Sequence, residues 1–135
     1  MKRELMSLRG ISLEWNDALR RGEPLTLWRL GDFVDDFRTR AATEEERLAL
    51  VREAPMWVDA PAQEDCNAYW AAMVETLCRE ARLNPPEWTE SPRCYLHRPW
   101  FAGAMEGLKA ILLAESPVAF RRRNLFVSSD ALARV

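Results

Sequence analysis

Hydrophobic residues recur at steps of three and four along most of the chain, and this spacing is typical of amphipathic helices. The longest stripe comprises Cys66, Trp70, Met73, Leu77 and Ala81. It predicts a helix over residues 62–83, ended by Asn84 and two prolines. No segment sustains the alternation of apolar and polar residues that a half-buried strand requires.

Shorter helices are predicted before it. Residues 11–21 carry a helical stripe that ends at Gly22, and residues 1–10 read as a tail or a frayed first helix. Pro24 suits the first turn of the next helix, because that turn does not need its missing N–H. The stripe of this helix is Leu27, Leu30, Val34 and Phe37, and its polar face is Asp32, Asp35, Asp36 and Arg38.

Thr43 and Glu46 form a capping-box pattern, in which the threonine oxygen accepts a backbone N–H and the glutamate reaches back. The pattern predicts a helix that begins there and stops before Pro55. Residues 56–61 then read as an apolar linker.

The last third of the chain is irregular and then helical again. Residues 87–101 are rich in proline and aromatic residues, and residues 103–114 form a helical stripe. Ser116 and Pro117 read as the cap and first position of a short helix ending near Asn124. Residues 125–127 are either extended or a tight turn, and Ser128 or Ser129 caps a last turn bearing Leu132.

We therefore expect an all-α fold, with residues 1–135 forming a single domain. It would be a compact array of about five to seven helices around one long central helix. The chain has six tryptophans among its 135 residues. Because tryptophan buries a large area, the core should be rich in aromatic rings, with one or two left for a partner surface.

Charge is distributed unevenly, although the net charge is only −2. Residues 32–53 hold seven acids against four arginines, whereas residues 117–135 hold four arginines against one aspartate. This asymmetry indicates steering towards a charged partner, or two patches that meet in an oligomer.

The cysteines do not indicate disulfides or a metal site. Three cysteines without a recurring spacing, and no apolar run of about 18 residues, predict a reduced cytoplasmic protein without a membrane span. Cys94 and His97 have the spacing of half a zinc site. Cys66 and Cys78 on one helix would lie roughly 18 Å apart, so they cannot complete it together.

Catalytic equipment is also sparse. His97 is the single histidine, the five glycines form no phosphate-binding loop, and no serine or cysteine has a nucleophile-elbow pattern. Asp32 and Asp36, one turn apart, favour a solvated helix face over a divalent-ion site. We expect no enzymatic activity, no cofactor and no metal.

The segment 114–132 is the best candidate for a functional surface. Arg121, Arg122 and Arg123 are consecutive and lie between two apolar triplets, which should fix where the guanidinium groups point. Arginine and aromatic residues are frequent interface anchors. We therefore expect Arg121, Arg122, Arg123 and Asn124 to contact a protein partner, with Phe120 and Phe126 as the buried anchors that orient them.

Two other interpretations remain open. The arginines can neutralise two or three phosphates, with Trp88 or Trp100 stacking on a base, which would make the protein an autoregulatory nucleic-acid binder. They can also pair with the acidic residues 32–53, within one chain or across a homodimer, with no other partner.

The motifs Pro85-Pro86-Glu87-Trp88-Thr89, Pro99-Trp100-Phe101 and Glu115-Ser116-Pro117-Val118-Ala119-Phe120-Arg121-Arg122-Arg123-Asn124-Leu125-Phe126-Val127 resemble a family of small bacterial proteins. The resemblance covers about residues 85–135. Members of that family resemble the smaller, antitoxin-like partner encoded beside predicted nucleotidyltransferases in toxin–antitoxin units. The resemblance implies a nucleotidyltransferase-type partner and no catalytic residue.

Overall fold

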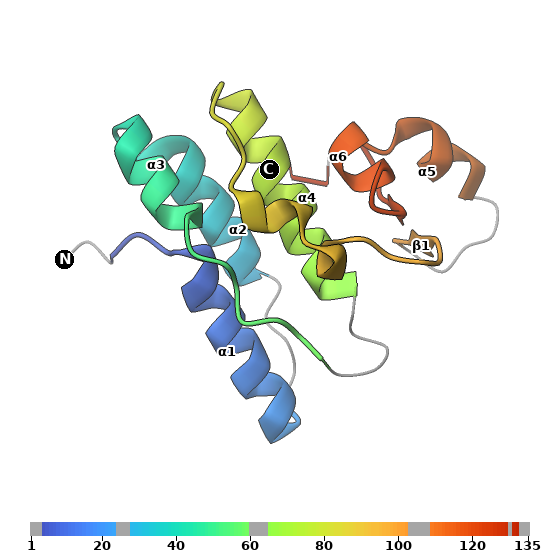
Figure 1. Ribbon diagram of the computed structural model, residues 1–135, viewed down its shortest axis with the longest axis horizontal. Coiled ribbons are helices and arrows are strands. Elements are labelled where there is room, and N and C mark those ends of the chain that lie inside the picture. The colour runs from blue at the N-terminus through green and yellow to red at the C-terminus, as the bar shows by residue number, and fades with distance from the viewer. Residues whose placement is uncertain (1–3, 24–27, 60–64, 103–108, 130, 133–135) are drawn as a thin grey trace.

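The computed structural model describes residues 4–23, 28–59, 65–102, 109–129 and 131–132. In this part of the chain the fold is predominantly helical, as predicted, with six α-helices and one very small sheet (Figure 1). The elements are α1 Leu8–Arg21, α2 Trp28–Asp35, a π-helical turn η1 Asp36–Arg40, α3 Glu44–Val51, α4 Asp65–Glu80, two 3₁₀ turns η2 Glu87–Glu90 and η3 Pro92–Cys94, β1 Trp100–Phe101, α5 Lys109–Glu115, α6 Val118–Arg121 and β2 Leu125–Phe126.

Helix α4 lies between two apolar clusters. Figure 1 shows α1, α2 and α3 on one side of it and β1, α5 and α6 on the other. Trp70, Met73 and Leu77 belong to the larger cluster, with residues of α1, α2, η1 and α3. Ala68 and Ala72 belong to the smaller one, with residues of β1, α6 and β2. We call β1, α5, α6 and β2 the C-terminal block. The long central helix is thus confirmed, and both of its faces are buried.

Helix α1 begins earlier than the hydrophobic stripe predicted. Ser7 is its N-cap and accepts a hydrogen bond from the N–H of Gly10 at 3.0 Å. Leu8 is completely buried, so at least residues 8–10 are neither a tail nor frayed. Gly22 ends the helix with φ 68°, a left-handed conformation that glycine adopts without steric cost.

Asp36 corrects the predicted polar face of the second helix. Its carboxylate is buried, accepting the N–H of Met6 at 2.8 Å and Arg40 Nη1 at 3.0 Å. The π-helical turn at residues 36–40 directs this side chain inwards, where it holds the segment that precedes α1. Pro24 and Leu27, the predicted start of this helix, lie outside the described residues.

The capping box at Thr43 is confirmed. Its hydroxyl accepts the N–H of Glu46 at 3.1 Å, and Glu46 reaches back to the N–H of Ala42 at 3.2 Å. The linker that follows α3 is held to α4 by Asn67, whose side chain bonds both the N–H and the carbonyl of Val58. This arrangement brings residues 58–59 alongside the start of α4.

The C-terminal block closes on itself through a short parallel pairing. Trp100 lies opposite Leu125 and Phe101 opposite Phe126, which confirms residues 125–126 as extended. Ser116 does not cap α6, contrary to the prediction. Its hydroxyl donates to the carbonyl of Leu125 at 3.0 Å and accepts the N–H of Val127 at 3.3 Å, so it ties the α5–α6 junction to β2.

Two further points concern the beginnings of two predicted helices and the predicted lack of a membrane span. The beginnings of the predicted helices at residues 62 and 103 lie outside the described residues, as does Asp130. Among the helices that are described, none has the length and apolar character needed to cross a membrane.

Candidate partner-binding surface

The three consecutive arginines leave a tight turn and diverge. Helix α6 is one turn long, and the chain continues as a turn in which Arg123 N–H donates to Phe120 and Asn124 N–H donates to Arg121, each at 3.0 Å. Asn124 then adopts φ 64° and leads into β2. Successive side chains of a helical turn point about 100° apart, so the arginines cannot form one edge.

Arg123 points into the protein, which corrects its predicted place on the surface. Its side chain is 0% exposed. Nη1 donates to Glu75 at 2.7 Å and to the carbonyl of Ala119 at 2.8 Å, and Nη2 donates to the carbonyl of Thr89 at 2.9 Å. Arg123 therefore joins α6 to α4 and η2, and it is not available to a partner.

Arg122 lies at the rim of the same site, with its side chain 37% exposed. Nη1 donates to Glu75 at 2.6 Å, and the guanidinium also makes two hydrogen bonds of 3.1 Å to the carboxylate of Glu90. Arg79 donates Nε to the other oxygen of Glu75 at 3.1 Å. We call Glu75, Arg79, Glu90, Arg122 and Arg123 the arginine–glutamate cluster.

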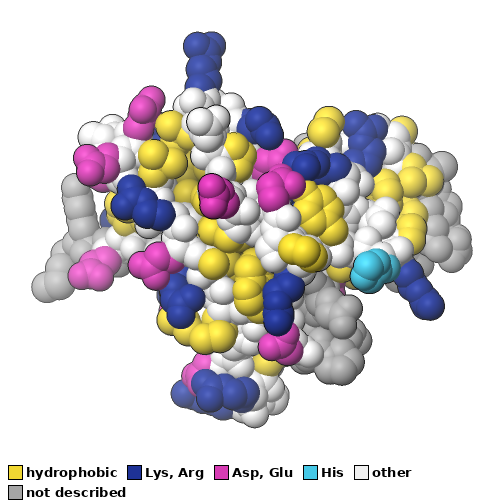
Figure 2. Space-filling view, in the orientation of Figure 1, with side chains coloured by type: hydrophobic (Ala, Val, Ile, Leu, Met, Phe, Trp, Pro, Cys, Tyr) yellow, Lys and Arg dark blue, Asp and Glu magenta, His cyan; other side chains and the backbone are white. Residues whose placement is uncertain are grey.

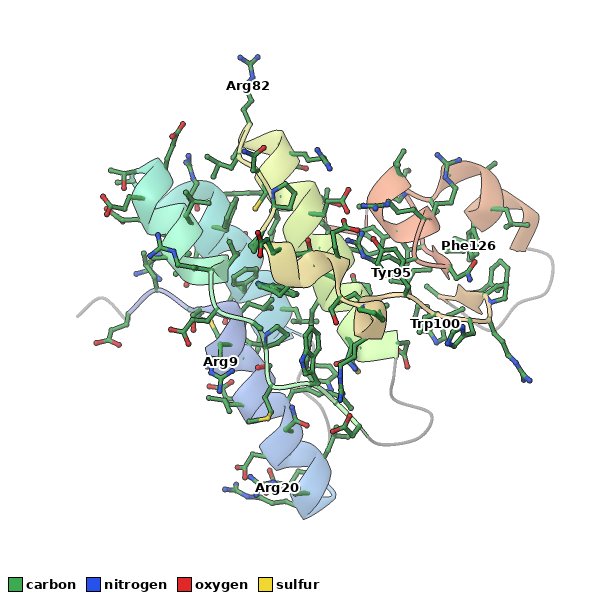
Figure 3. All side chains as sticks on the ribbon, in the orientation of Figure 1. Arg9, Arg20, Arg82, Tyr95, Trp100 and Phe126 are labelled. Carbon is green, nitrogen blue, oxygen red and sulfur yellow. The ribbon has the colours of Figure 1, made fainter. Side chains whose placement is uncertain are left out.

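Tyr95 covers this cluster. The guanidinium carbon of Arg123 lies 5.1 Å from the centre of the Tyr95 ring and that of Arg122 lies 5.6 Å from it. The Tyr95 hydroxyl donates to Glu90. Figure 3 labels Tyr95 between α4 and the α5–α6 region, where it stands beside these charges. Such cation–π contacts add to the ion pairs when the cation is partly desolvated.

The charges of the cluster support one another. Burial alone would raise the pKa of Glu75, but hydrogen bonds from Arg123 and Arg79 and the charges of Arg123 and Arg122 outweigh it and lower the pKa. The pKa of Glu90 is lowered chiefly by the hydrogen bond from Tyr95, with Arg122 contributing further. Both carboxyl groups are therefore ionised at neutral pH.

Arg122 and Arg123 thus pair with acids of the same chain, but with other acids than the sequence suggested. Their partners are Glu75 and Glu90, not residues 32–53. Glu75 was missed, although one signal for it exists. It stands beside Val74 and two positions before Leu77, where a charge on a buried helix face requires a partner of opposite charge.

Phe120, Phe126 and Asn124 all serve the inside of the C-terminal block. Both phenylalanines are buried: Phe120 packs edge-on against Tyr69 at 5.2 Å and Phe126 stacks on Phe101 at 5.1 Å, between ring centres. The Asn124 side-chain amide donates to the carbonyl of Leu96 at 2.7 Å. These residues position the arginine turn.

Arg121 is exposed, and unlike Arg122 and Arg123 it forms no ion pair within the described residues. It shares its region with unusually exposed apolar side chains: Ile111 and Leu113 on α5 are 49% and 48% exposed, and Val118 on α6 is 64% exposed. Figure 2 shows cationic and hydrophobic side chains together over the part of the molecule that contains α5 and α6. We call Ile111, Leu113, Val118 and Arg121 the α5–α6 surface.

The structure brings no metal ligands together in the part that it describes. No group of three or more histidine, cysteine, aspartate or glutamate side chains that could hold an ion occurs there. None of the three cysteines forms a disulfide and all three are buried, and burial raises the pKa of Cys66 and Cys94 to about 12 and that of Cys78 to about 11. His97 is exposed.

Comparison of the chain with models of protein families, with curated proteins and with solved structures finds no match.

Proposed function

We propose that this chain is a non-enzymatic protein-binding module that contacts its partner through the α5–α6 surface. The observation that carries the proposal is the exposure of Val118 and Arg121, which lie three positions apart and so share one face of α6, together with the exposed apolar side chains Ile111 and Leu113 of the preceding helix. Interfaces combine an apolar centre with arginine, which contributes both charge and contact area. The buried pair Glu75–Arg123 behind α6 gives this surface a rigid support.

The partner that fits this surface is an acidic protein. Arg121 keeps its charge available, because no described carboxylate neutralises it. The resemblance of residues 85–135 makes a nucleotidyltransferase-type toxin the specific candidate, and the chain would restrain it as an antitoxin does. Carboxylates that bind metal in such an enzyme would provide the complementary charge.

Binding to nucleic acid has less support. Arg122 and Arg123 are already neutralised by Glu75 and Glu90. Of the triplet, only Arg121 is left to contact a phosphate, whereas affinity for DNA or RNA depends on several such contacts.

The test is co-purification of the chain with the product of the adjacent gene, both expressed at native stoichiometry. We expect a complex that is lost in Val118→Asp and in Arg121→Glu. Matched controls are Leu13→Asp on α1, which is 45% exposed, and Arg82→Glu, whose side chain Figure 3 shows projecting from the C-terminal end of α4. Both controls should retain the complex.

Four outcomes would contradict the proposal. The neighbouring product could elute separately, or all four variants could bind equally well. Sedimentation could instead show that the chain alone is a dimer that Val118→Asp dissociates, in which case the α5–α6 surface binds a second copy. A retardation of operator DNA that Arg121→Glu abolishes would favour the nucleic-acid interpretation.

A further inference from the structure

A cavity of about 450 Å³ lies between α1, α2 and the first half of α4. Four aromatic side chains line it: Trp15 from α1, Tyr69 and Trp70 from α4, and Trp100 from β1. Its volume falls in the range of ligand pockets, about 300–1,000 Å³. Protein interiors are otherwise close-packed, so a space of this size beside the main core is exceptional. We call it the aromatic cavity.

The aromatic walls of this cavity are fixed by their neighbours. The rings of Trp15 and Trp70 stand at 86° to each other with their centres 6.2 Å apart, and both are almost completely buried. The ring of Tyr69 packs in a similar way against Phe120, at 74° and 5.2 Å. Trp100 is half-buried, and Figure 3 labels it near β1 and the N-terminal end of α4. A ligand therefore meets rings that are already in place, which lowers the cost of ordering them.

Aliphatic side chains and a thioether supply much of the remaining described wall. Leu30 and Val34 come from α2, Met73 comes from α4, and the half-buried Leu132 lies near the end of the chain. Removal of apolar surface from water favours binding of an apolar molecule to such walls. The thioether of Met73 also makes favourable contacts with aromatic edges.

The four rings favour one class of apolar ligand over others. Aromatic rings attract one another in offset-stacked and edge-to-face arrangements, with centres about 4.5–7 Å apart, beyond what burial of their area contributes. A cavity of about 150 Å³ already holds benzene, so this volume admits a second ring. We propose that the aromatic cavity is a binding site for an apolar molecule with two fused aromatic rings. The site is separate from the α5–α6 surface, since none of its described lining residues belongs to α5 or α6.

The probe for this proposal is naphthalene, and decahydronaphthalene is its saturated counterpart with the same carbon skeleton. Neither compound carries a charge, so charges on the wall do not decide the comparison. Titration of the whole chain with naphthalene should give saturable shifts of the indole N–H signals of Trp15, Trp70 and Trp100 in ¹H–¹⁵N NMR spectra. The signals of Trp57 and Trp88, which pack on each other and are not among the described lining residues, serve as internal controls. Decahydronaphthalene should bind about tenfold more weakly, because it lacks the ring–ring contacts.

Three variants test the geometry. Gly31 lines the cavity from within α2, and Gly31→Leu should fill the space and abolish binding of both compounds. Leucine has a higher helix propensity than glycine, so this change does not weaken the helix itself. Asp32→Leu is the matched control, because it places the same side chain at the next position of α2, which is not among the described lining residues. Where Gly31→Leu fails to fold, Trp100→Leu still tests the ring contacts: it should weaken naphthalene by about tenfold and decahydronaphthalene by less than about twofold.

The proposal is overturned if naphthalene does not bind, or if the two compounds bind equally well, since the rings would then contribute nothing. It is also overturned if the signals of Trp57 and Trp88 shift as much as those of the lining residues, or if Gly31→Leu and Asp32→Leu behave alike. Failure here would leave the proposed partner binding untouched, since none of these variants alters the α5–α6 surface.

Discussion

Glu75 and Arg123 are opposite charges in the protein interior, and each is tolerated there because of the other. Transfer of an ion out of water costs several kcal/mol, which only close pairing and further hydrogen bonds offset. Glu75 receives hydrogen bonds from three arginines, and Arg123 also donates to two backbone carbonyls. The pair therefore specifies how the C-terminal block docks on α4.

Removal of Glu75 should be strongly destabilising. In Glu75→Ala, Arg123 loses its buried counter-ion, and we expect a loss of about 3–5 kcal/mol in the free energy of unfolding, measured by urea denaturation. Glu87→Ala, an exposed glutamate of η2, should change it by less than about 0.5 kcal/mol. The double variant Glu75→Ala/Arg123→Met should recover part of the loss. Equal instability of the single and double variants would contradict this account.

The lowered pKa values of the same two carboxyl groups predict that the protein becomes less stable at acid pH. Glu75 and Glu90 have a pKa below the ordinary value of 4.5 in the folded state. A lowered folded-state pKa contributes stability that is present above the unfolded-state pKa and is lost as the pH falls. The free energy of unfolding should therefore decrease below about pH 4.5. Glu75→Gln should lose less stability than the wild type between about pH 7 and about pH 3. Parallel profiles for the two proteins would refute the assignment.

At this scale the sequence located the arginine turn but not the direction of each side chain. Arg121, Arg122 and Arg123 are chemically identical neighbours. Their side chains differ in burial and in partners because of the backbone geometry after α6. That geometry depends on Asn124, whose side chain bonds Leu96 far away in the sequence. A contact of this kind has no signature in the local pattern of residues.

Among the elements, helix ends that depend on local hydrogen bonds were predictable. Thr43 and Gly22 act through residues within four positions of them, so their patterns were sufficient. The predictions for Asp36 and Ser116 were wrong because the hydrogen bonds of these two side chains are not local. Each satisfies a distant backbone group, the N–H of Met6 and the carbonyl of Leu125. Polar residues next to apolar runs gain such partners only when the chain is folded.

Loss of the Ser116 hydroxyl should accordingly reduce the free energy of unfolding by more than loss of a helix cap would. Ser116→Ala leaves the carbonyl of Leu125 and the N–H of Val127 without this partner in a buried place, and we expect a loss of about 1–3 kcal/mol. Amide hydrogen exchange at Val127 should also become faster. Ser129→Ala, at an exposed position of the same segment, should leave both measurements unchanged. An effect of Ser116→Ala no larger than that of Ser129→Ala would argue against the tie.

For the whole molecule, the decisive feature is that α4 serves both apolar clusters. Trp70 and Leu77 pack into the larger cluster, whereas Ala68 and Ala72 pack against the C-terminal block. The salt bridge from Arg38 to Glu80 and the bond from Arg38 to the carbonyl of Leu132 add a second connection. When α4 unfolds, both clusters lose the helix against which they pack. The two clusters should therefore unfold together.

This coupling tests the expectation of a single domain. Ile11, on α1, is 2% exposed in the larger cluster, and Ile11→Ala should cost about 2–5 kcal/mol. The N–H of Ala102, which donates to Phe126 in the C-terminal block, is far from it along the chain. If the clusters unfold as one unit, hydrogen exchange at Ala102 accelerates by the factor that corresponds to the whole loss of stability. Leu13→Ala, on the exposed face of the same helix, should not change it. If Ile11→Ala leaves the hydrogen-exchange rate at Ala102 unchanged, the C-terminal block folds independently of α1. In that case α4 does not couple the stability of the two clusters that pack on its faces.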